Sequence, residues 1–262
     1  MTAPAPRPAA TVIVLRDRPT GLEVFLLQRG RGLGFMANAW VFPGGRVDPH
    51  DALVDHPSVI GGGRALSFWG LSRTDGVGYL VAAIRETLEE VGIWLGDGAI
   101  GEDERARVVG GGGLGDLLDR TGATVDLDRL APWSWWVTPE VEPRRYDTRF
   151  LLAIADAEAG PLQEHEAAAA RWIRPCDALA EAAAGTLGLA PPTWWTLTEL
   201  ATYTTAADAA AALRSPRAIR PIADLTDGFL LCLPGDPRHP EPPIAGLPSR
   251  IQFGQGRWWA TR

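Results

Sequence analysis

The sequence predicts an α/β protein whose first strands lead into a helix with an acidic face. Apolar residues cluster with strand-like spacing over residues 10–15 and 22–28. A helix-like run begins near residue 78 and ends at Gly92, where a helix stop is expected. The hydrophobic content of 46% and charged content of 22% are near the averages of globular domains, so disorder is disfavoured. No apolar run reaches the ~18 residues that a membrane helix needs.

The remaining elements follow from short periodic segments and turn signals. A polar turn joins the first two strands, and a short strand at 40–42 leads to a glycine pair. Farther along we expect a helix at 114–120, paired strands at 133–138 and 146–155, a strand at 171–173, and helices at 175–184 and 193–212. These segments predict a flexible leader at 1–9, a main domain at 10–188 with an insertion at about 52–78, and a mainly helical C-terminal appendage at 189–262.

The acidic helix is the most informative segment of the chain. Glu86, Glu89 and Glu90 are spaced so that one helix face carries all three carboxylates, which repel one another. This crowding is explained if the face binds a hard divalent cation, because Mg²⁺ prefers oxygen ligands and binds through a few carboxylates plus substrate phosphates. A solvated glutamate-rich surface is the alternative. It is disfavoured by the turn Pro43-Gly44-Gly45 that precedes the helix and by the stop at Gly92.

These residues resemble the signature of the Nudix hydrolase family. In that pattern a glycine is followed after five residues by Glu, then after seven residues by R-E-U-x-E-E-x-G-U, where U is a bulky apolar residue. Gly45 begins the match here, and the run from Arg85 to Ile93 completes it. Two departures stand out: Asp51 replaces the first Glu, and an insertion of about 26 residues separates it from Arg85. Thr87 is a third, milder departure at an apolar position.

Further strings are similar to one branch of the family, the peroxisomal coenzyme A diphosphatases. They are residues 26–29 and 34–45 before the box, 138–139 and 145–150 after it, and 221–222 and 227–236 near the end. The resemblance therefore runs along most of the chain. It implies an α/β/α sandwich with a mixed sheet and a Mg²⁺-dependent hydrolase, with Mn²⁺ as a second usable ion. The implied reaction cuts coenzyme A or acyl-coenzyme A into 3',5'-ADP and a phosphopantetheine.

The resemblance also implies roles for individual residues. Glu86, Glu89, Glu90 and the carbonyl of Gly45 would bind the metal, with Glu89 and Glu90 also serving catalysis. Arg85 would orient the carboxylates through charge-assisted hydrogen bonds; its alternative is a surface ion pair. For the further acid that the family places outside the box we select Glu166. Glu164 is the second choice, and a plain solvated loop is the alternative.

Substrate recognition is expected to use arginine, because its rigid fork binds phosphoryl oxygens through paired hydrogen bonds. The candidates are Arg29, Arg31 and Arg149, each of which would otherwise pair with a surface carboxylate. One of the 11 tryptophans would stack on adenine, while most are expected in the core. Two other functions stay open: hydrolysis of ADP-ribose or another nucleoside diphosphate derivative, and a non-catalytic nucleotide-binding regulatory module.

The charge and the termini set the remaining expectations. A net charge of −7 argues against an extended nucleic-acid surface, and the basic residues are all arginine, as in GC-rich bacterial genomes. Cys176 and Cys232 are expected to be reduced. Without a signal peptide or a peroxisomal tripeptide, a cytoplasmic location is the default. Family resemblance leaves a homodimer open. The glycine-rich insertion is expected to be either a lid over the site or a passive surface loop.

Overall fold

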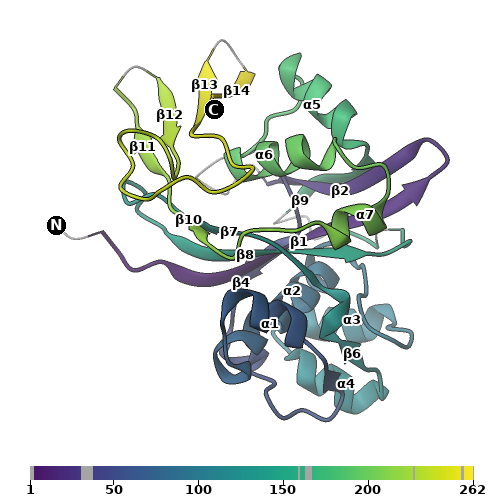
Figure 1. Ribbon diagram of the computed structural model, residues 1–262. Helices are drawn as coiled ribbons and strands as arrows, with labels where there is room; N and C mark the ends of the chain where they lie inside the picture. The colour runs from purple at the N-terminus through teal and green to yellow at the C-terminus, as the bar shows by residue number, and fades with distance from the viewer. Residues whose placement is uncertain are drawn as a thin grey trace.

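A central mixed sheet lies between a layer of helices and a second layer of helices and short strands (Figure 1). The computed structural model describes residues 3–30, 38–158, 160–162, 167–226, 228–254 and 257–261 of the 262-residue chain. The predicted α/β class with a mixed sheet between helical layers is confirmed. Within the described residues, no helix is long and apolar enough to cross a lipid bilayer.

The central sheet runs in the order β10-β7-β8-β1-β2-β3, with β4 paired to β1 and β9 paired to β2. Its strands are β1 (Arg7–Arg18), β2 (Gly21–Arg29), β3 (Trp40–Val41), β4 (Gly44–Arg46), β7 (Ala131–Val137), β8 (Tyr146–Ile154), β9 (Ala167–Ile173) and β10 (Ala218–Ile219). On the side away from β8, β1 pairs with β4 through residues 9–11 and with β2 through residues 15–18. The sheet therefore divides along β1, and the division opens a space at one face.

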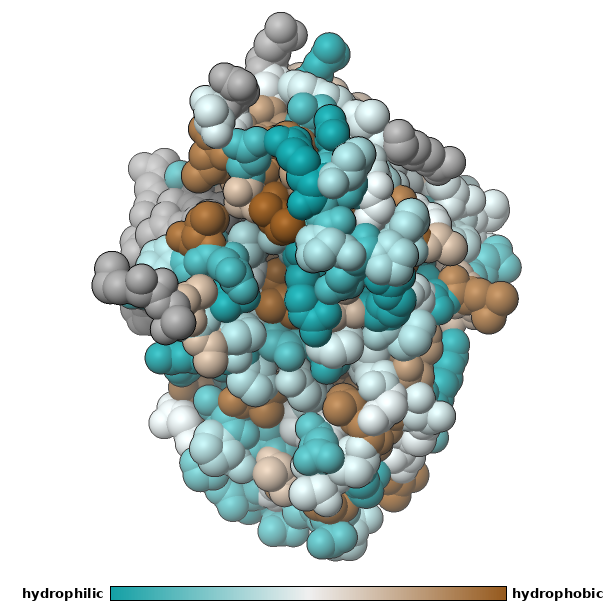
Figure 2. Space-filling view, turned by 60° about the vertical axis from the view of Figure 1, so that its left-hand side comes forward, coloured by the Kyte–Doolittle hydropathy of each residue, from teal (hydrophilic) through white to brown (hydrophobic). Residues whose placement is uncertain are grey.

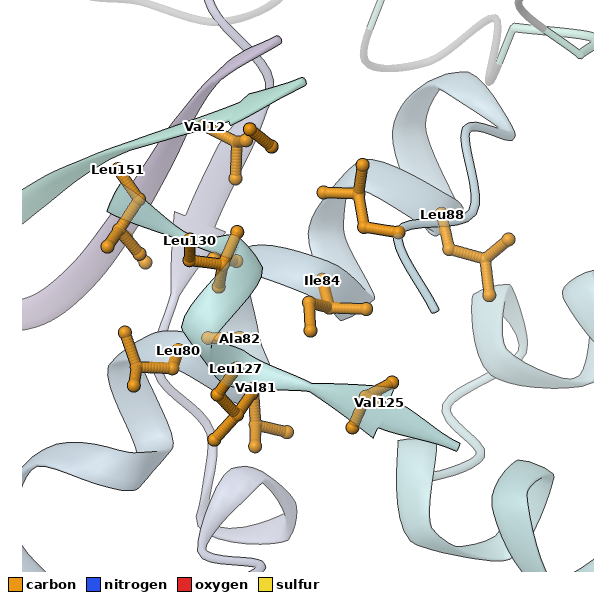
Figure 3. Close-up of a cluster of buried hydrophobic side chains, with 14 of the residues drawn as sticks. Val12, Leu80, Val81, Ala82, Ile84, Leu88, Val125, Leu127, Leu130 and Leu151 are labelled. Atoms are coloured by element: carbon orange, nitrogen blue, oxygen red, sulfur yellow. The ribbon is translucent and has the colours of Figure 1, made fainter. Parts of the chain in front are cut away.

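One layer consists of α1 (Gly63–Trp69), α2 (Arg73–Val91), α3 (Glu102–Val109) and α4 (Leu114–Thr121). The turns η1 (Pro49–Asp51) and η2 (Leu127–Arg129) and the strands β5 (Val59–Ile60) and β6 (Val125–Asp126) connect them. Val12 and Leu151 of the sheet share one apolar core with Ile84 and Leu88 of α2 (Figure 3). Their burial fixes α2 against the sheet and leaves its glutamate face toward β4.

The insertion forms α1 and the start of α2 and is part of this helical layer. It is therefore neither of the two expected structures, a lid over the site or a passive surface loop. Leu66, Trp69 and Val77 are buried in the same core as α2. The helix begins at Arg73, earlier than predicted, because the Ser72 hydroxyl accepts a hydrogen bond from the Asp75 N–H and caps it. The glycines that suggested flexibility serve the helix start instead, since Gly62 precedes α1 with a φ of +87°.

The other layer holds α5 (Pro175–Ala183), α6 (Pro191–Leu200), α7 (Ala206–Ala211) and an antiparallel sheet. Its strands are β11 (Ile222–Asp224), β12 (Phe229–Cys232), β13 (Arg250–Gly254) and β14 (Arg257–Thr261). The prediction of a mainly helical appendage is therefore wrong, and the helix predicted at 193–212 is broken between α6 and α7. Strands of three to five residues are too short to display a clear alternation. Leu231, Leu233 and Ile251 also share a core with Ile13 of β1, so this region is continuous with the central sheet.

Candidate active site

The acidic face of α2 lines a pocket of about 550 Å³ where the central sheet divides. Strand β1 contributes Ala9 to Thr11, β4 contributes Gly44 to Arg46, and the end of β2 contributes Arg29. From α2 come Arg85, Glu86, Glu89 and Glu90. The predicted metal-binding residues and the turn that precedes the helix thus meet in one pocket, although about forty residues separate them in the sequence.

The glycine pair allows β4 to approach the helix closely. A Cβ on Gly45 would lie 2.4 Å from the carboxylate carbon of Glu86, and one on Gly44 would lie 2.3 Å from the carbonyl oxygen of Ala10. Gly44 also has a φ of +151°, which side-chain-bearing residues rarely adopt. Its N–H donates to Glu90 Oε2 at 2.9 Å. Any larger residue at either position would push the carboxylates and the turn apart.

Arg85 connects the acidic cluster to the start of the insertion. Its Nε and Nη2 donate to the two carboxylate oxygens of Asp51 at 2.8 and 2.9 Å, and its Nη1 lies 2.9 Å from Glu86 Oε1 and 3.1 Å from Glu89 Oε2. Burial would lower the pKa of Arg85, but the hydrogen bonds to Asp51 and the charges of Glu86 and Glu89 outweigh it and raise the pKa above its usual value. Arg85 is therefore a permanent cation that contacts three carboxylates, and because it is 5% exposed it is not a surface ion pair.

The donor set fits a divalent cation. Carboxylate oxygens on α2 face a backbone turn that glycine keeps clear of side chains. In the described residues no three carboxylate, imidazole or thiolate groups are gathered around a single point. Arg85 lies between Glu86 and Glu89 and reduces their repulsion.

A second arginine, which the sequence analysis missed, holds the C-terminal end of α2. Arg105 of α3 is 3% exposed and donates to the carbonyl oxygens of Leu88 at 2.8 Å, Glu89 at 2.9 Å and Pro161 at 2.6 Å. Cations near a helix C-terminus are favourable because they meet its unpaired carbonyls. Arg105 therefore fixes the very turn that presents Glu89 and Glu90. No motif signals it, because these partners are backbone carbonyls of α2 and of Pro161, which lies in the segment after β8.

The predicted substrate arginines have different positions. Arg29 lines the pocket, and its Nε is buried without a hydrogen-bond partner among the described residues. Arg149 does not line this pocket. Thr148 and Phe150 line the pocket, so the alternation of β8 directs Arg149 to the opposite face. There its guanidinium stacks 3.5 Å from the Trp135 ring centroid, and burial lowers its pKa.

The remaining predicted residues are two acids and an arginine expected at the site, the tryptophans and the two cysteines. Arg31, Glu164 and Glu166 lie outside the described residues. Trp133, Trp136 and Trp195 are buried in the core, the fate expected for most of the tryptophans. Cys176 and Cys232 form no disulfide and are free thiols.

Comparison with known proteins places this geometry in a family. A profile described as the NUDIX domain matches residues 5–106. A crystal structure of a Nudix hydrolase from Alicyclobacillus acidocaldarius is 31% identical and superposes with a TM-score of 0.71, covering 81% of this chain and 98% of that one. The chain belongs to the Nudix hydrolase family. It is therefore an enzyme of a family whose members generally use divalent metal ions, and the pocket at the acidic helix is its candidate active site.

Curated relatives extend the similarity beyond the profile match. The acyl-coenzyme A diphosphatase NUDT19 of Gallus gallus is 29% identical, over 86% of this chain and 75% of its own length. The putative nudix hydrolase 7 of Caenorhabditis elegans is also 29% identical, over 88% of this Nudix hydrolase and 73% of its own length. The alignments therefore reach past residue 106 into the region that forms the second layer.

Proposed function

We propose that this Nudix hydrolase cleaves the diphosphate linkage of coenzyme A or acyl-coenzyme A in the presence of Mg²⁺, with Mn²⁺ as a substitute. The products are 3',5'-ADP and a phosphopantetheine. The observation that carries the proposal is the acidic face of α2 against the Gly44–Gly45 turn, in a pocket that also contains Arg29. The similarity to acyl-coenzyme A diphosphatases over most of the chain supports the choice of substrate.

In this proposal Glu86, Glu89, Glu90 and the Gly45 carbonyl hold the metal. The bound ion withdraws charge from the diphosphate oxygens and makes water a better nucleophile. Arg85 and Asp51 keep the carboxylates in place, and the glycine turn brings β4 close to them.

The remaining groups act on the substrate. Arg29 contacts a phosphoryl oxygen, since its guanidinium lies at the pocket wall. The water oxygen bonds to phosphorus, the bridging P–O bond breaks, and the leaving phosphate takes the electron pair. Glu166 is our candidate for the base that accepts the proton of the water, with Glu164 as the second choice.

The test is product formation from a substrate panel, followed by chromatography with and without Mg²⁺. The panel contains coenzyme A, acetyl-coenzyme A, ADP-ribose, NADH and diadenosine polyphosphates. We expect preferential cleavage of the coenzyme A compounds and a loss of at least ~100-fold in kcat for Glu90→Gln, because a metal ligand is removed. The matched control is Asp103→Asn, an exposed carboxylate in the first turn of α3.

Two results would contradict the proposal. A preference for ADP-ribose or a dinucleotide would keep the metal site but replace the substrate. Binding of a nucleotide without turnover by the unaltered enzyme, with or without metal, would favour the non-catalytic module.

A further inference from the structure

An apolar groove adjoins the active-site pocket and has no part in the chemistry described above. Its volume is about 220 Å³. We call it the side groove and define it by Trp136, Pro139, Val141, Pro221, Leu225 and Phe229, which line it. These residues come from the end of β7, the loop before β8, and the β11–β12 hairpin, so the C-terminal layer supplies much of the wall.

The side groove is continuous with the active-site pocket. Thr11, Thr148, Phe150, Ala190 and Pro192 line both cavities. A molecule whose diphosphate lies at α2 can therefore extend from the active-site pocket into the side groove.

The two cavities differ in chemistry. The active-site pocket contains arginines and glutamates, which suit phosphates and a cation. The side groove is lined by proline, valine, leucine and aromatic side chains, with Glu142 and threonine hydroxyls among its polar groups. Val141 and Leu225 are 58% and 59% exposed, although both are large apolar residues. Figure 2 shows apolar side chains gathered beside a hollow in the upper half of the face it presents. Such clusters on a protein surface are typical of binding sites.

We infer that the side groove binds the apolar acyl group of the substrate. The inference rests on the proposed function and makes it more specific: acyl-coenzyme A with an aliphatic chain is favoured over free coenzyme A. An alkyl chain has no polar atoms, so contact with proline, valine and leucine leaves no hydrogen bond unmade. An adenine ring is the competing occupant, but its edge carries ring nitrogens and an amine that need polar partners.

The expected consequence is a dependence of kcat/KM on acyl length. Burial of one methylene is worth a factor of about two to four, which predicts a steady rise from acetyl- through hexanoyl- to decanoyl-coenzyme A until the groove is filled. Free coenzyme A gives the reference value at the start of the series.

The test uses a double variant, Val141→Thr with Leu225→Asn. Both side chains are more than half exposed, so polar replacements of similar size keep the fold. We expect the length dependence to flatten while kcat/KM for free coenzyme A stays unchanged. The matched control is Leu213→Asn, a fully exposed leucine outside both cavities, which should keep the full length dependence.

Three outcomes would overturn the inference. The unaltered enzyme could show no dependence on acyl length. The double variant could lower kcat/KM equally for free coenzyme A and the acyl compounds, which would assign the groove to a part common to all of them, such as adenine. If the enzyme cleaves ADP-ribose and no coenzyme A compound, the proposed function itself fails and the acyl site fails with it. Melting curves of the variants separate each result from misfolding.

Discussion

The carboxylate of Asp51 and the guanidinium of Arg85 form a two-point ion pair across 34 positions of sequence. Asp51 is fully buried and also accepts a hydrogen bond from the Asp48 N–H at 2.8 Å. The insertion begins directly after Asp51. It ends within α2, the helix that continues to Arg85. The ion pair between Asp51 and Arg85 therefore connects the two ends of the insertion. Asp51 therefore still supplies a carboxylate at the position where the family signature has glutamate.

Asp51→Asn is expected to lower the free energy of unfolding by about 3 kcal/mol, because it removes the fully buried charge that pairs with two nitrogens of Arg85. It should also reduce kcat, since Arg85 would no longer be held beside Glu86 and Glu89. Chemical denaturation and steady-state kinetics check both effects. The exposed Asp55 of the insertion provides the control variant Asp55→Asn, which should change neither. Equal stability of the two variants would contradict a structural role for the pair.

Gly45→Ala tests the close approach of β4 to the catalytic helix. The added methyl would lie 2.4 to 2.6 Å from the carboxylate atoms of Glu86, so that side chain must move. We expect at least a ~10-fold loss of kcat, since a displacement of about 1 Å in a site can cost that much or more. Gly63→Ala is the control, because a Cβ there meets no atom within 4 Å. If Gly45→Ala keeps the kcat and the metal dependence of the unaltered enzyme, the close approach of β4 to Glu86 is not needed for catalysis.

The acidic helix and the strands around it could be predicted because their signals are local. Glu86, Glu89 and Glu90 share a face through helix geometry alone, and β1 and β2 show enough apolar residues to be recognised. Gly44 and Gly45 were predictable from the family signature together with the turn chemistry.

The missed features depend on long-range packing. Whether Arg149 faces the pocket is decided by the register of β8, and a shift of one residue would reverse it. The short strands of the C-terminal layer are stabilised by pairing and by the core around Ile13, which local spacing does not encode. The roles of Arg31 and Glu166 stay predictions.

Arg105→Met should loosen the C-terminal turn of α2. The variant keeps much of the aliphatic stem but leaves the carbonyls of Leu88 and Glu89 without their donor, so we expect a loss of about 2 kcal/mol in stability. We also expect kcat to fall more than KM rises, because Arg105 positions Glu89 without contacting substrate. Arg107→Met is the matched control: its side chain is 58% exposed and pairs with Glu104 on the surface. If Arg105→Met and Arg107→Met change stability and kcat equally, the hydrogen bonds from Arg105 to α2 do not position Glu89.

Asp236 provides a pH-dependent test of how the C-terminal layer is held. Its side chain is fully buried and pairs with Arg250 of β13 and with Arg238. Burial would raise the pKa of Asp236, but the hydrogen bonds from Arg250 and the Arg238 N–H lower it below the usual value. The unfolded chain therefore binds a proton more readily than the folded one. The stabilisation is present above the ordinary carboxyl pKa of about 4 and is lost as the pH falls through the lower folded value.

Asp236→Asn should therefore cost about 2 kcal/mol at pH 7, a value kept modest because both arginines remain partly exposed to water. The difference from the unaltered enzyme should begin to shrink at about pH 4, where Asp236 of the unfolded chain is protonated, and approach zero below the lower pKa of the folded carboxylate. Denaturation curves at several pH values measure this directly, with Asp55→Asn as the reference. A difference that stays constant down to low pH would show that packing, and not the charge of Asp236, holds β13 to the preceding loop.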